Sequence, residues 1–188
     1  MTILNRNDQS GRSMIEMLGV LAIIGVLSVG GISGYSKAMA KYKLTKAQDQ
    51  ITMLLMNIRT AYATSPSYSD LTSIKAAEYN LAPNEMVTKN TNGSYTGLNG
   101  TFGGAVTVEA CTADKCGENH GNTYFYITFA SLGKEACRSL ASSDWGADGL
   151  VSMKVGDTSY GVSDLPVNLG AADTACGDGP TDVTWIYY

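Results

Sequence analysis

The sequence predicts an α+β fold: one long N-terminal helix, apolar in its first half and amphipathic in its second, packed on an antiparallel β-sheet domain with short helices. Three observations predict it. An apolar run from Met14 to Tyr35 carries a single charge. Helical periodicity then continues to Ala63. The rest of the chain is rich in Gly, Thr, Ser and Tyr and contains all four cysteines, which is typical of a loop-rich β domain in an oxidising compartment.

Composition excludes some classes of function. The 188 residues are 44% hydrophobic, enough for one globular core plus attachments. The formal charge of −4 argues against a nucleic-acid partner, because binding to phosphates requires clustered Lys and Arg.

The predicted N-terminal helix is long enough to contain a membrane-spanning half and an amphipathic half. Its apolar run can cross a hydrocarbon core of about 30 Å as a transmembrane segment, or can serve as the core of a signal sequence. A removed signal would end soon after this core, whereas here the run leads straight into more helix. From residue 14 to 63 a continuous helix would be about 75 Å long. Its second half places apolar residues at spacings of three and four: Leu44, Ala47, Ile51, Leu54, Leu55, Ile58 and Tyr62.

Glu16 is the one charge in the apolar run. A carboxylate near the end of a membrane span is costly, and it either reaches the headgroups or has a function. Gly11-Arg12-Ser13-Met14-Ile15-Glu16, followed by the apolar run, resembles the processing site of type IV prepilins: a Gly, the cut, and a Glu at the fifth mature position. An apolar residue usually follows the cut in that family, so Arg12 departs from the pattern.

The resemblance implies a complete assembly route. A prepilin peptidase cuts between Gly11 and Arg12, residues 1–11 are a discarded leader, and Arg12 is N-methylated. Glu16 then pairs with the N-terminal amine of a neighbouring subunit as helices pack into a homopolymer. Further implied partners are an inner-membrane platform, an assembly ATPase and an outer-membrane secretin.

Four glycines interrupt the apolar run: Gly25, Gly30, Gly31 and Gly34. Small residues allow close helix packing, as in Gly30-x-x-x-Gly34. Alternatively, the weak helix propensity of Gly, up to about 1 kcal/mol per residue, lets the helix unwind locally in a filament, as the resemblance implies.

Two signals disagree about topology. Lys37, Lys41, Lys43 and Lys46 follow the span, so the positive-inside rule places the C-terminus in the cytoplasm. The cysteine-bearing domain requires an oxidising compartment, and we give this requirement precedence. We therefore expect a single-pass inner-membrane precursor with a periplasmic C-terminus, later part of an extracellular pilus. The expected divisions are 1–11 leader, 12–36 membrane and polymerisation half, 37–64 amphipathic half and 65–188 head.

The head is expected to combine short helices with strands. We predict a helix over Asp70–Asn80 capped by Ser69 or Asp70, a loop from Asn90 to Gly104, and a helix over Ser131–Ser142 that turns Leu132, Ala136, Cys137 and Leu140 toward the sheet. The predicted strands are 105–110, 123–129, 150–155 and 183–188.

Four cysteines allow three pairings, of which we favour Cys137 with Cys176 and Cys111 with Cys116. A Cys in the helix after a central strand, bridged to one near the C-terminus, resembles type IVb pilins and the thin-pilus pilins of conjugative plasmids. That resemblance implies a surface region bounded by Cys137 and Cys176. Its candidate exposed or subunit-contacting residues are Trp145, Asp148, Asp157, Tyr160 and Asp173.

The expected function is a structural one: a pilus subunit, most simply the major pilin, for adhesion, aggregation or conjugative mating contact. Alternatives are a minor or tip pilin, a type II secretion pseudopilin, or a tethered enzyme or binding protein. We expect no enzyme and no cofactor. Cys111, Cys116 and His120 could be read as zinc ligands, but the compartment favours a disulfide, so no metal is expected.

Overall fold

The computed structural model describes residues 8–117, 121–146 and 149–188, with side chains described from residue 14 onward. The chain divides into two compact units, Met1–Tyr42 and Lys43–Tyr188. Helix α1 (Asp8–Ala61) begins in the first unit and ends in the second. The continuous helix predicted over residues 14–63 is therefore present, and it starts six residues earlier than predicted and ends two residues sooner.

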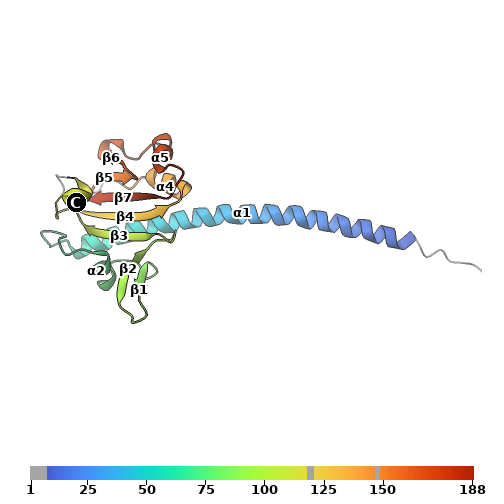
Figure 1. Ribbon diagram of the computed structural model, residues 1–188, viewed down its shortest axis with the longest axis horizontal. Coiled ribbons are helices and arrows are strands. Elements are labelled where there is room, and N and C mark those ends of the chain that lie inside the picture. Colours follow the sequence, from blue (N-terminus) through green and yellow to red (C-terminus); the bar gives the residue numbers. More distant parts are fainter. Residues whose placement is uncertain (1–7, 118–120, 147–148) are drawn as a thin grey trace, which may run out of the picture. The chain divides into compact units, whose positions relative to one another are not determined.

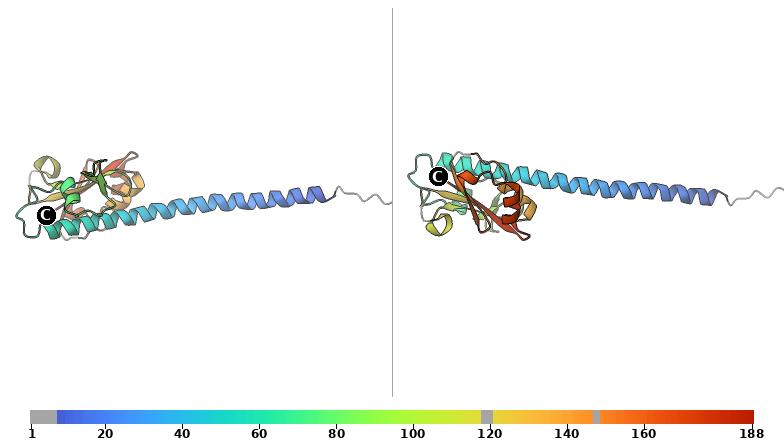
Figure 2. Two further views of the ribbon diagram at one scale, coloured as in Figure 1. Left: turned by 90° about the horizontal axis from the view of Figure 1, so that it is seen from below. Right: turned by 90° about the horizontal axis from the view of Figure 1, so that it is seen from above.

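The second unit is built on one antiparallel sheet (Figures 1 and 2). Its strands lie in the order β1-β2-β3-β4-β7-β5-β6. Their bounds are β1 (Val87–Lys89), β2 (Tyr95–Asn99), β3 (Ala105–Ala110), β4 (Phe125–Leu132), β5 (Leu150–Val155), β6 (Thr158–Gly161) and β7 (Thr181–Tyr187). The last strand of the chain thus lies in the middle of the sheet, between β4 and β5.

One stripe of α1 supplies the core on the inner face of this sheet. Ala47, Ile51, Leu54 and Ile58 are fully buried at helical spacing. They belong to the same hydrophobic cluster as the inward residues of β4 and β7, among them Phe125, Phe129, Val183 and Trp185. The amphipathic half of α1 predicted from periodicity is therefore part of the folded domain.

Short helices complete the unit. They are α2 (Ser73–Glu78), α3 (Ala113–Cys116), α4 (Lys134–Ala141), a 3-10 turn η1 (Val162–Asp164) and α5 (Leu169–Cys176). Helices α4 and α5 contribute Cys137, Leu140, Ala172 and Cys176 to the inner cluster, so both pack on the face of the sheet that α1 covers. Strands β3 and β5 have the predicted bounds.

Helix α2 is shorter than the predicted Asp70–Asn80, and its cap is neither Ser69 nor Asp70. Thr72 is the N-cap, and its hydroxyl accepts a hydrogen bond from the backbone N–H of Lys75 at 3.2 Å. The carbonyl of Leu71 accepts a hydrogen bond from the N–H of Ala110, the last residue of β3, and not from a residue of α2. The helix therefore begins after Leu71.

The predicted loop over Asn90–Gly104 contains strand β2, with β1 before it. The two strands form a hairpin whose turn includes Asn92-Gly93, with Gly93 at φ +81°. The strand was missed because Gly97 lies inside it. Its extended backbone is stabilised by pairing with β1 and β3 rather than by its own propensity.

The helix predicted over Ser131–Ser142 begins only at Lys134. Ser131 and Leu132 belong to β4, where Leu132 lies opposite Thr181 across an irregularity in the ladder. Leu132 is buried, as predicted, but from a strand rather than from a helix face. Strands β6 and β1 and helices α3 and α5 were not predicted.

Candidate assembly helix and disulfide-bounded region

The N-terminal half of α1, taken by itself, presents apolar side chains to its surroundings. Large hydrophobic residues from Met14 to Tyr35 are between 53% and 76% exposed. The stretch is long and apolar enough to cross a membrane. A continuous apolar surface of this size marks a segment that is covered by lipid or by other protein.

Glu16 lies among these residues and is exposed. Gly11 and Arg12 lie within α1, although their side chains are outside the described set. Gly25, Gly30, Gly31 and Gly34 are all helical, and a Cβ added at any of them would meet no atom within 4 Å. Contacts within this chain therefore do not explain the glycines. Local unwinding in a filament stays a prediction, because α1 is continuous through all four.

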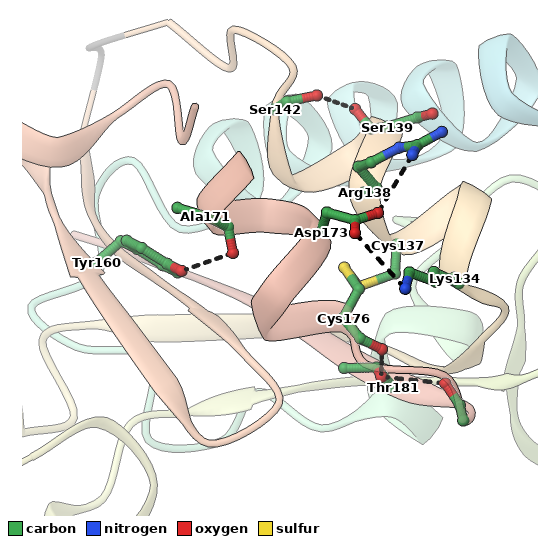
Figure 3. The surroundings of a disulfide bond; sticks show 11 residues. Lys134, Cys137, Arg138, Ser139, Ser142, Tyr160, Ala171, Asp173, Cys176 and Thr181 are labelled. Atoms are coloured by element: carbon green, nitrogen blue, oxygen red, sulfur yellow. Dashed lines mark hydrogen bonds and ion pairs between the residues drawn. A yellow bond between two sulfur atoms is a disulfide. The ribbon is translucent and has the colours of Figure 1, made fainter. Parts of the chain in front are cut away.

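Two disulfides occur in the head. Cys137 of α4 is bonded to Cys176 of α5, with Cα atoms 5.9 Å apart (Figure 3). Cys111 is bonded to Cys116 across α3, with Cα atoms 5.6 Å apart. These are the two pairings favoured from the sequence. Cys137 is fully buried, as its predicted inward position requires.

Ion pairs join α4 and α5 above the long bridge (Figure 3). Lys134 Nζ lies 3.5 Å from Asp173 Oδ2 and 3.0 Å from Asp178 Oδ1, and Arg138 Nη1 lies 3.2 Å from Asp173 Oδ1. The hydrogen bond to Asp178 is the main cause of the raised pKa of Lys134. Lys134, Arg138 and Asp173 are partly exposed and Asp178 is almost fully exposed, so solvent screens the pairs, and the covalent bridge is the stronger link between the helices.

The short bridge belongs to a different surface. Cys111 and Cys116 form a small cluster with Tyr126 and Ile186, separate from the inner core. Tyr126 donates a hydrogen bond to Glu109 Oε2 at 2.7 Å, and burial raises the pKa of its hydroxyl. The bridge and α3 thus cover part of the outer face of the sheet. Both candidate zinc-binding cysteines are consumed by this disulfide, and His120 lies outside the described residues.

The comparisons with known proteins agree with this architecture. The family described as PilS N terminal matches residues 41–187. The major structural subunit of bundle-forming pilus from Escherichia coli O127:H6 is 30% identical, over 77% of this chain and 69% of the relative. The chain belongs to the type IV pilin family. The corresponding subunit from Escherichia coli O111:H- is 29% identical to this pilin over 98% of the chain and 97% of the relative.

A solved structure supports the fold of this pilin. The type IV b pilin from Salmonella typhi superposes with a TM-score of 0.56 at 21% identity, over 77% of this chain and 97% of the other. At that identity the likeness concerns the fold alone. The predicted pilin fold, a long N-terminal helix with an antiparallel sheet, is confirmed.

The residues of the region bounded by Cys137 and Cys176 that were predicted to be exposed or to contact another subunit differ in their exposure. Asp157 is exposed, and Asp148 lies outside the described residues. Trp145 is half-buried: its ring centroid is 5.0 Å from that of the buried Trp185, and its Nε1–H donates to the Leu140 carbonyl. The indole therefore packs against the core of this pilin, and its contact with another subunit stays a prediction.

Tyr160 and Asp173 are also only partly exposed. The Tyr160 hydroxyl donates to the Ala171 carbonyl at 3.4 Å, which ties β6 to α5, and Asp173 accepts from α4 as described above. Sequence reasoning missed α5 itself. The sequence feature that could have predicted α5 is Asn168, a favourable N-cap residue, whose side chain accepts a hydrogen bond from the N–H of Ala171.

Proposed function

We propose that this pilin is a structural subunit of a type IV pilus, and most simply its major subunit. The observation that carries the proposal is the contrast between the two units. One half of α1 presents an uncovered apolar surface, whereas residues 43–188 form a closed domain with a buried core. The named function of the relatives, the major structural subunit of a bundle-forming pilus, supports the same conclusion.

Helix packing between subunits accounts for the exposed half of α1. In the precursor we place this half in the inner membrane, where lipid covers it. In the filament the same surface is covered by the α1 helices of neighbouring copies. Adhesion, aggregation or mating contact would then be properties of the exposed heads.

Processing follows from the residues before the span. The leader 1–11 is removed by a prepilin peptidase after Gly11, and Arg12 becomes the methylated N-terminus. Glu16 then pairs with the N-terminal amine of a neighbouring copy. Among apolar helices, the Glu16 carboxylate or the neighbour's N-terminal amine is costly to bury without a partner. A subunit that packs out of register leaves both charges unpaired, so the pair favours the correct register.

The disulfides favour an orientation with the head in the periplasm. Two bridges in residues 111–176 support folding of the head in the periplasm, although the lysines after the span favour the opposite topology. The proposed divisions are 12–36 for polymerisation, 37–64 for the amphipathic half of α1 and 65–188 for the head. Export then requires an inner-membrane platform, an assembly ATPase and a secretin.

The experiment compares two carboxylate removals in cells that make the pilus. Glu16→Ala is expected to remove the subunit from the sheared surface fraction while leaving the membrane pool at its normal level. Glu78→Ala changes an exposed carboxylate of the head and serves as the matched control, with normal filaments expected. Normal filaments from Glu16→Ala would overturn the role of Glu16. Abundance in the wild-type sheared fraction separates a major subunit from a minor pilin or a pseudopilin.

A further inference from the structure

Four exposed side chains surround α1 where its apolar half ends. They are Tyr35, Lys37, Lys41 and Tyr42, which we call the collar. The two tyrosines are 67% and 60% exposed, and both lysines are exposed. In an α-helix, residues four or seven positions apart lie on the same side, so the lysines share one side of α1 and the tyrosines the other. The collar therefore combines a pair of positive charges with a pair of aromatic rings.

The lysines of the collar are available to a partner outside this chain. Within the described residues neither Lys37 nor Lys41 forms an ion pair. By contrast, Lys46 in the second unit lies 2.9 Å from Glu85 Oε2. The sequence contains no Asp or Glu between Glu16 and Asp49, so α1 itself offers the collar no acidic neighbour.

The collar has the composition and the place of a membrane-interface segment. At 1.5 Å per residue the apolar run from Met14 to Tyr35 is about 33 Å long, close to a hydrocarbon thickness of about 30 Å. From Lys37 to Lys41 the helix rises about 6 Å, which matches a headgroup layer of roughly 5–8 Å. Tyrosine is enriched at this depth because its ring is apolar and its hydroxyl polar. Lysine stems lie along apolar surface while their ammonium groups reach outward.

We propose that the collar binds the phosphate groups of anionic phospholipids at the membrane surface where the span ends. This inference rests on the proposed function, because it requires the apolar half of α1 to span the inner membrane. Near an anionic membrane surface each lysine strengthens binding by up to about fivefold at low salt. The proposal also gives a role to lysines that disagree with the positive-inside rule: they hold the end of the span at the headgroups.

The acidic head of a second copy is the other candidate partner for the lysines. Residues 65–188 contain 14 Asp and Glu but 6 Lys and Arg, a formal charge of −8. Lipid is favoured because Tyr35 and Tyr42 lie at the edge of the span, where a headgroup layer accounts for the rings as well as the charges. The negative head repels an anionic surface, so a preference for anionic lipid originates in α1 and not in the head.

The lipid selectivity of the full chain tests the proposal. The chain is reconstituted in phosphatidylcholine vesicles that contain spin-labelled phosphatidylglycerol or spin-labelled phosphatidylcholine, and electron spin resonance measures the labelled lipid held at the protein. Phosphatidylglycerol is expected to be favoured about threefold or more in dilute salt. The preference should decline in about 1 M salt, where the Debye length is about 3 Å. Equal retention of the two lipids overturns the proposal.

Variants of the collar assign the preference to its lysines. Lys37→Gln combined with Lys41→Gln should lower the preference about twofold or more, with the remainder due to Arg12 and Lys43 near the two ends of the span. Lys37→Arg combined with Lys41→Arg retains the charge and should retain the preference, which separates loss of charge from loss of the fold. An unchanged preference in the Gln variant contradicts the assignment.

The matched control combines Lys89→Gln with Lys115→Gln, which removes two exposed positive charges from the head. It should keep the wild-type preference, and a loss equal to that of the collar variant contradicts the collar as the site. Alkaline extraction of the vesicles distinguishes this proposal from the proposed function. A chain that alkali removes has no span, and both fail. A chain that stays without a lipid preference overturns the collar alone, and loss of filaments in the Gln variant would then identify the head of a second copy as the partner.

Discussion

Removal of each disulfide should destabilise the head by a different and calculable amount. The bridge between Cys137 and Cys176 closes a separation of 39 residues, whereas that between Cys111 and Cys116 closes only 5. The chain-entropy relation gives about 4 kcal/mol for the long bridge and about 2 kcal/mol for the short one. The variants are Cys137→Ala with Cys176→Ala, and Cys111→Ala with Cys116→Ala, each compared with the wild-type chain.

Urea unfolding of the full chain in detergent measures both losses. The sequence has two tryptophans, Trp145 and Trp185, and their rings lie 5.0 Å apart in the head, so fluorescence reports on this unit. With a slope of about 2 kcal/mol per molar urea, the midpoint should fall by roughly 2 M for the long bridge and 1 M for the short one. The half-exposed ion pairs between α4 and α5 are too weak to replace the long bridge. A larger loss from removing the short bridge would refute this reasoning.

Three further changes test packing, a close backbone approach and charge. Leu54→Ala removes a fully buried side chain from the stripe of α1 and should lower the free energy of unfolding by about 2–5 kcal/mol, measured by urea titration. Gly104→Ala should lower the melting temperature more than Gly179→Ala: neither glycine has a positive φ, but only at Gly104 would a Cβ overlap a backbone atom, the carbonyl oxygen of Ala130. The hydrogen bond with Lys46 lowers the pKa of Glu85 in the folded chain. The ionised Glu85 therefore stabilises the fold above the pKa of an unfolded glutamate, and this contribution disappears as pH falls through the lowered pKa. Glu85→Gln should therefore lower the urea midpoint at pH 7 and reduce its decline in acid.

The sequence was most informative where local and tertiary preferences agree. The apolar run and the periodicity of α1 predicted the helix because hydrophobic spacing and length point to the same element. The strand bounds 105–110 and 150–155 matched because both segments alternate or cluster β-branched residues. Cys137 was placed inward by the same periodicity, although the helix that carries it begins later than predicted.

The missed elements depend on partners far away in the chain. Strand β6 has only four residues and exists through its pairing with β5, and β2 contains Gly97 at φ +150°. The polar neighbours of Trp145 predicted a surface residue, but a long-range contact with Trp185 covers part of its ring.

Processing and assembly are tested together by the intact mass of the subunit in sheared surface filaments, measured with and without reduction. The expected mass is that of residues 12–188 plus one methyl group, and it is four hydrogens lower without reduction because both disulfides are formed. One spectrum thereby tests cleavage after Gly11, methylation of Arg12 and assembly of this chain into filaments. A full-length chain that is absent from the filament fraction would contradict the account.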